Sequence, residues 1–205
     1  MIVLAESNFV IELALEQEEA AHAQRIVELA EAHQIALVIP ACAFAEPYHT
    51  SVRRQRERSA LISLLRKDLR QLGRSKSFTK LLRTSDEVMR ILAESERTEA
   101  RGLDDAVQRL TACCRIPALS QATIDAAQQL RRDFELQHDD SIVLASIDAA
   151  LRETGPGTKV FVNKNWRDFE KQSIQTHLQQ YGCKLISSFA AARQFIEHGI
   201  AKREH

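Results

Sequence analysis

Apolar positions along the chain follow two different spacings. Short apolar runs, several with β-branched members, fall at 2–4, 36–39, 160–162 and 183–186, and they predict buried strands. Between them, apolar residues recur every three or four positions, which predicts helices. Because strands alternate with helices towards both ends of the chain, we expect a parallel sheet with helices on both faces.

The middle of the chain, from 51 to about 111, shows only the helical spacing. Thr84 and Glu87 form a capping-box pattern that supports a helix start there. Glycine and proline are too scarce at the edges of this stretch for a hinge. We therefore predict one domain over 1–205 with a helical insertion at 53–112. The expected class is α/β, a three-layer α/β/α arrangement around a central parallel sheet of about four to five strands.

Composition narrows the classes of function. Apolar residues make up 44% of the 205 and charged residues 27%, which favours a packed core over disorder. No apolar run approaches the ~20 residues that a membrane span needs, and the N-terminus lacks the basic region of a signal peptide. The four cysteines form no C-x-x-C pair, so a reduced cytoplasm fits best. Zinc spacings, a P-loop and a G-x-S-x-G elbow are all missing.

Charge is distributed unevenly, although the formal net charge is zero. Residues 1–50 hold eight acids and one base, 51–83 hold two acids and eleven bases, and 84–105 hold seven acids and three bases. A solvated helix face is the ordinary explanation for a basic run. This excess also suits phosphate binding. A third interpretation is an acidic protein surface, which 84–105 could supply within the chain.

Polar residues follow directly after the predicted strands. In a parallel sheet, ligands bind beyond the carboxyl ends of the strands. The residues that this rule brings to one edge are Glu6, Ser7, Asn8, Glu46, Asp139, Asp140, Asn163, Asn165 and Asp168. Clustered carboxylates repel each other unless a cation lies among them, and Mg²⁺ prefers oxygen ligands. We expect such an ion to activate water for attack on a phosphodiester.

Each of these residues has a simpler explanation when it is taken singly. Asp139 or Asp140 can cap a helix, and so can Ser7 or Asn8. Glu46 can be a helix surface residue, although its neighbours from 42 to 48 are mostly apolar. Asp168 can be an ordinary loop residue. Their joint position at strand ends is what favours a functional site.

Several blocks of the sequence resemble the PIN-domain family. The opening Ile2–Ile11 is similar to the family's first strand, acidic motif and helix. Pro40–Tyr48, with Glu46, resembles the second acidic position. Asp140–Ser146 resembles the family's Asp-Ala-Leu-Ile-Ala-Ala helix, and Phe161–Phe169 its next strand and loop. Tyr181–Ile186 is similar to the usual final strand.

The resemblance implies a PIN-like fold and a Mg²⁺- or Mn²⁺-dependent ribonuclease. It implies catalytic roles for Glu6, Glu46, Asp140 and Asp168, with Glu6, Asp140 and Asp168 as metal ligands and Asn8, Asn163 and Asn165 as supporting groups. We expect the substrate, single-stranded RNA, to contact Arg53, Arg54, Arg56 and Arg58 in the basic run. The family includes toxins of toxin–antitoxin pairs, so an antitoxin or other protein partner and a homodimer are further expectations.

Three functions follow from these observations. The first is a metal-dependent endoribonuclease acting on single-stranded RNA. The second is a PIN-like module that has lost catalytic strength and serves in RNA binding or as a scaffold. The third is a toxin whose helical insertion docks an antitoxin. None of the three calls for a membrane.

Overall fold

Four short parallel strands form one small sheet in the described part of the chain. The computed structural model describes residues 1–75, 78, 82–164, 169 and 171–202. The sheet has the order β2-β1-β3-β4. Its strands are β1 (Ile2–Ala5), β2 (Ala36–Val38), β3 (Lys159–Val162) and β4 (Cys183–Ile186). These positions confirm the strands that the apolar runs predict.

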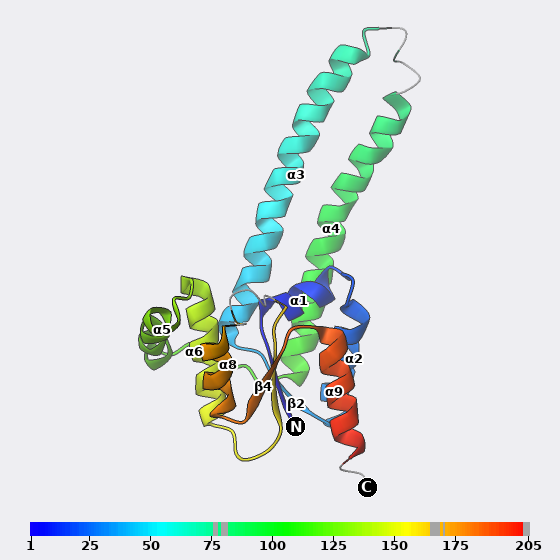
Figure 1. Ribbon diagram of the computed structural model, residues 1–205. Coiled ribbons are helices and arrows are strands. Elements are labelled where there is room, and N and C mark those ends of the chain that lie inside the picture. The colour runs from blue at the N-terminus through cyan, green and yellow to red at the C-terminus, as the bar shows by residue number, and fades with distance from the viewer. Residues whose placement is uncertain (76–77, 79–81, 165–168, 170, 203–205) are drawn as a thin grey trace.

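Helices make up most of the molecule (Figure 1). Their bounds are α1 (Ser7–Ala14), α2 (Ala20–Glu31), α3 (Ala45–Leu72), α4 (Leu82–Cys113), α5 (Gln121–Phe134), α6 (His138–Arg152), α8 (Gln172–Gln179) and α9 (Phe189–Ala201), and a short 3-10 helix, η1 (Ala41–Phe44), precedes α3.

The predicted fold class is wrong. About 70% of the described residues are helical and the sheet is small, so this is a predominantly helical protein and not a PIN-like three-layer α/β/α domain. The alternation of strands and helices indicates the order of the elements but not their relative size. Each strand has only three or four residues, whereas α3 and α4 have 28 and 32.

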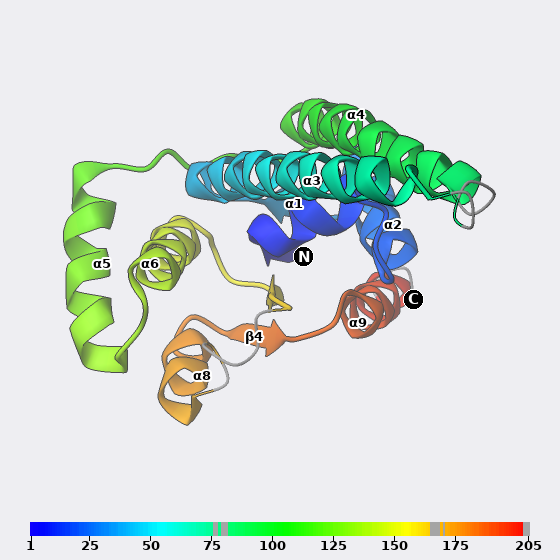
Figure 2. The same ribbon diagram turned by 90° about the horizontal axis from the view of Figure 1, so that it is seen from above.

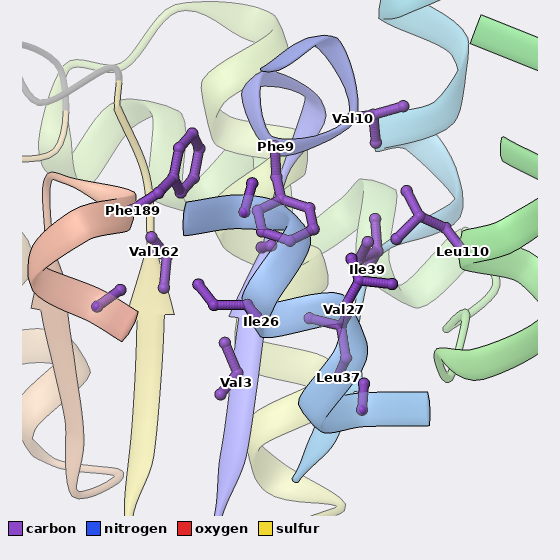
Figure 3. Packing of buried hydrophobic residues seen from close by; sticks show 14 of the residues in the cluster. Val3, Phe9, Val10, Ile26, Val27, Leu37, Ile39, Leu110, Val162 and Phe189 are labelled. Atoms are coloured by element: carbon purple, nitrogen blue, oxygen red, sulfur yellow. The ribbon is translucent and has the colours of Figure 1, made fainter. Parts of the chain in front are cut away.

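Two groups of buried apolar side chains lie against the sheet. Successive residues of a strand point to opposite faces, so Val3 belongs to one group and Leu4 to the other. The group around Val3 joins α1, α2 and α9, and Figure 3 shows Phe9 of α1 beside Phe189 of α9. Their ring centroids are 5.3 Å apart in an edge-to-face arrangement. The group around Leu4 includes residues of α6 and α8. The sheet is therefore held by contacts between segments far apart in the sequence.

The helices α3 and α4 form a long hairpin that extends away from the sheet (Figure 1). Seen from above in Figure 2, α1 lies beneath the hairpin, with α5 and α6 on one side and α2 and α9 on the other. The hairpin comes close to α1 at Gly102 of α4, where an added Cβ would lie 2.2 Å from the Ala14 carbonyl oxygen. The absence of a side chain at Gly102 thus lets α4 meet the end of α1.

No helix in the described ranges combines the length and apolar character that crossing a membrane requires.

Candidate functional site

An open pocket of about 450 Å³ lies where β1 and β3 end and where α1, α3 and α6 begin. Its lining is strongly acidic: among the described residues it includes five carboxylic side chains and one lysine. The polar and charged lining residues are Glu6, Ser7, Asn8, Glu12, Gln17, Glu46, Gln137, Asp139, Asp140, Asn163 and Lys164.

Glu6 and Glu46 meet through the hydroxyl of Ser7. Ser7 Oγ lies 2.6 Å from Glu6 Oε2 and also contacts Glu46 Oε2. A hydroxyl has one hydrogen and can donate it to only one carboxylate at a time. Two charged carboxylates around this oxygen would therefore repel each other without a second proton or a cation between them.

Glu6 is buried, with 5% of its surface exposed. Burial raises the pKa of Glu6 to about 7, and the nearby Glu46 carboxylate acts in the same direction. Hydrogen bonds from Ser7 and Asn8 favour the charged form and lower the pKa only in part. Glu6 Oε1 is buried and has no hydrogen-bond partner. This oxygen is an unused acceptor beside the pocket.

Asp139 and Asp140 of α6 also line the pocket. Both lie in the first turn of α6, whose positive helix end stabilises negative charge. Asp139 is exposed and Asp140 is half-buried. Asn163 follows β3 directly and is almost completely buried. The pocket thus collects polar groups from segments that are far apart in the sequence.

A partly buried ion pair lines the pocket. Lys164 Nζ lies 3.0 Å from Glu12 Oε2 and 3.9 Å from Glu19 Oε2, and the Glu12 side chain is 1% exposed. Glu19 in turn accepts hydrogen bonds from the Ser188 hydroxyl and the Phe189 amide at the start of α9. These bonds, with the charge of Lys164, lower the pKa of Glu19 despite its partial burial. The network ties the loop after β3 to α1 and α9.

The structure brings together most of the acidic and amide residues predicted for the site. Glu6, Asn8, Glu46, Asp140 and Asn163 all line the pocket. Asn165 and Asp168 lie outside the described residues, so their predicted roles stay predictions.

The four predicted RNA-binding arginines lie on α3 and do not line the pocket. Arg53 and Arg56 are exposed. Arg54 is half-buried beside α1, in a small cavity near the base of the hairpin. Arg58 forms an ion pair with Glu99 of α4. The acidic stretch 84–105 therefore supplies a partner to the basic stretch at this position.

Sequence reasoning missed the contributions of Glu12 and Lys164. The sequence held a signal for Glu12. It lies between Ile11 and Leu13 on a mostly apolar helix, and such a helix is usually buried, so its one acid is expected to need a partner. Lys164 adjoins Asn163, but its pairing with Glu12 spans 152 positions of sequence and no local pattern indicates it.

The oxygen donors present fit Mg²⁺ or Mn²⁺. Carboxylates, a hydroxyl and a buried, unpartnered Glu6 oxygen are the hard ligands that these ions prefer. Within the described residues, no three His, Cys, Asp or Glu side chains come together as a metal-holding group. Mg²⁺ usually keeps several waters and is bound by one or two carboxylates plus substrate phosphates. The Glu6–Glu46 pair is sufficient for that mode.

No protein-family model matches the chain, and no curated protein matches it significantly. The resemblance to PIN domains consequently stays a prediction that depends on the sequence blocks alone.

Proposed function

We propose that this protein is a metal-dependent endoribonuclease that cleaves single-stranded RNA at the acidic pocket. The observation that carries the proposal is the Glu6–Ser7–Glu46 contact, with its unpartnered Glu6 oxygen, in a pocket that Asp139 and Asp140 also line. So many carboxylates in one place are costly to folding unless they serve a cation.

Glu6 and Glu46 would hold the ion, and Asp140, which lines the same pocket, would contact it through water. A bound Mg²⁺ or Mn²⁺ lowers the pKa of a coordinated water and stabilises the negative charge that develops at the phosphate. Water would add to phosphorus as the bond from phosphorus to the leaving ribose oxygen breaks, and the leaving oxygen would take a proton from solvent. Asp139, being exposed at the pocket, is placed to accept the proton that the water loses.

RNA binding without cleavage is the second candidate. The finding that favours it is that the described residues contain no group of three metal-ligating side chains. An antitoxin or other protein partner, a homodimer and a cytoplasmic location are further proposals that rest on the sequence alone.

The test is cleavage of an unstructured RNA with Mn²⁺ or with EDTA. We expect Asp140→Asn to lose at least about a hundredfold in rate, because the several kcal/mol that a metal contributes to the transition state depend on the carboxylates that surround it. Asp125→Asn is the matched control, since Asp125 is exposed on α5 away from the pocket. Circular dichroism checks that both variants fold. Binding of RNA without any Mn²⁺-dependent cleavage would favour the second candidate, and equal cleavage by both variants would remove Asp140 from the site.

A further inference from the structure

We propose that the outer face of α3 is an extended binding site for single-stranded RNA that leads into the acidic pocket. The inference deepens the proposed function and rests on it only for the reaction at the pocket end. Binding along α3 is a separate property that can be measured without cleavage.

The helical periodicity of α3 places a series of basic residues on the same side of the helix as Glu46. Residues separated by alternating steps of three and four share one face of a helix, and α3 is uninterrupted from Ala45 to Leu72. Starting at Glu46, which lines the pocket, these steps pass His49 and reach Arg53, Arg56, Ala60, Ser63, Lys67 and Arg70. Arg74 follows in the turn after the helix. We call Arg53, Arg56, Lys67, Arg70 and Arg74 the α3 track.

No residue of the α3 track forms an ion pair with an acid in the described part of the chain. All five of its residues are exposed. Among the described residues, no ion pair engages Arg53, Arg56, Lys67 or Arg74, and Arg70 Nε contacts only the Arg66 carbonyl oxygen. By contrast Arg58, on the side of α3 that faces α4, is paired with Glu99. The basic residue between α3 and α4 is therefore paired with an acid, whereas the α3 track is exposed to solvent.

The far end of the α3 track gathers several arginines around one groove. A groove of about 560 Å³ lies near the tip of the hairpin, and Arg66, Arg70 and Arg74 contribute to its lining. Guanidinium groups bind phosphate oxygens with two parallel hydrogen bonds, and several of them in one groove attract an anion strongly. The track therefore runs from the acidic pocket to this groove.

The length and form of the α3 track favour a single strand. At 1.5 Å per residue, the distance along the helix axis from Glu46 to Arg74 is about 42 Å. A stacked strand, at about 3.4 Å per nucleotide, covers this distance with about 12 nucleotides. A row of cations that winds slowly along one helix can follow one phosphate backbone, whereas a duplex would turn its second strand away from the helix. Figure 1 shows α3 running straight from the sheet end of the molecule to the tip.

The experiment measures how binding of a 12-nucleotide RNA depends on salt, in EDTA and in the Asp140→Asn background so that no cleavage interferes. Removing three phosphate contacts from a single strand lowers the slope of log K against log salt by about 2. We expect this change in the triple variant Lys67→Gln/Arg70→Gln/Arg74→Gln. The charge-preserving variant Lys67→Arg/Arg70→Lys/Arg74→Lys should keep the original slope.

A control removes the same number of charges elsewhere. Arg131, Arg132 and Lys202 are exposed on or beside α5 and α9, far from the tip (Figure 1), and their change to Gln should leave the slope unaltered. Unaltered slope in the α3 variant, absence of RNA binding at low salt, or equal preference for a 12-base-pair duplex would each overturn the inference. Salt-dependent binding by a parent protein that does not cleave would instead uphold the track and contradict the proposed nuclease. Cleavage by the parent protein, together with an unaltered salt slope in the α3 variant, would support the proposed nuclease and contradict the α3 track.

Discussion

The sheet region and the α3–α4 hairpin are built on different principles. In the sheet region, segments from both ends of the chain bury Phe9, Phe161 and Phe189 completely. In the hairpin, α3 buries only Pro47 and Ile62 among its 28 residues. Burial of apolar side chains stabilises the sheet region. The hairpin is stabilised instead by local helix formation and by the contact between α3 and α4. The many charged residues of the hairpin therefore lie away from the apolar core of the sheet region.

The same substitution in the two regions should give the largest difference. Leu4→Ala removes a fully buried side chain of β1, and we expect it to cost about 2–5 kcal/mol of unfolding free energy through lost burial and a cavity. Leu64→Ala, at a position on α3 that is 64% exposed, should change stability by less than about 0.5 kcal/mol. Urea unfolding of both variants measures this. Equal losses would mean that the exposed face of the hairpin is covered in solution.

The pH dependence of stability should arise from the sheet region, through Glu6. Its pKa is raised from 4.5 to about 7 in the folded protein, so folding favours the protonated form. The resulting stabilisation is complete below pH 4.5 and is lost as pH rises through about 7; full ionisation would cost about 3 kcal/mol.

The measurement is the unfolding free energy in EDTA from pH 5 to 8. The parent protein should lose stability over this interval, while Glu6→Gln, which cannot ionise, should lose much less. Parallel curves for the two proteins would show that Glu6 ionises as freely in the folded state as in the unfolded one.

Two glycine substitutions examine the junction between the regions. Alanine in place of a helical glycine normally stabilises a helix by up to about 1 kcal/mol. At Gly102 the new Cβ would meet the Ala14 backbone, so Gly102→Ala should instead cost about 1–3 kcal/mol. At Gly199 of α9 the Cβ would meet the flexible end of the Met1 side chain, which can move.

We therefore expect Gly199→Ala to be neutral or slightly stabilising. Thermal unfolding of the two variants compares them directly. A stabilising Gly102→Ala would imply that α4 does not approach α1 as closely as the structure indicates.

The strands and one helix cap were predictable because local chemistry determines them. Apolar runs identify all four strands, and Ser120 caps α5 by accepting a hydrogen bond from the Thr123 amide, as its type predicts. The proportion of helix was not predictable from alternation alone. The predicted start of the insertion, residue 53, lies inside α3, so Glu46 and the basic residues share one helix. Pro47 does not interrupt this helix, because it lies in the first turn.

The candidate site was predictable where residues follow a strand or begin a helix at one edge of the sheet. This rule locates Glu6, Asp140 and Asn163 in the pocket. It gives no information on Glu12 and Lys164, whose contact arises from packing between α1 and the loop after β3. It also could not separate Arg58 from Arg53 and Arg56, because the seam with α4 is a tertiary feature.

Calorimetric titration of Mn²⁺ measures whether the acidic pocket binds a divalent cation through Glu6. At pH 8 we expect the parent protein and Asp125→Asn to bind Mn²⁺ equally, and Glu6→Gln to bind at least about tenfold more weakly because a ligand charge is lost. Near pH 7, binding should release protons from Glu6, seen as a heat that depends on the buffer. Undiminished Mn²⁺ affinity in Glu6→Gln, or no binding by the parent protein, would contradict the account.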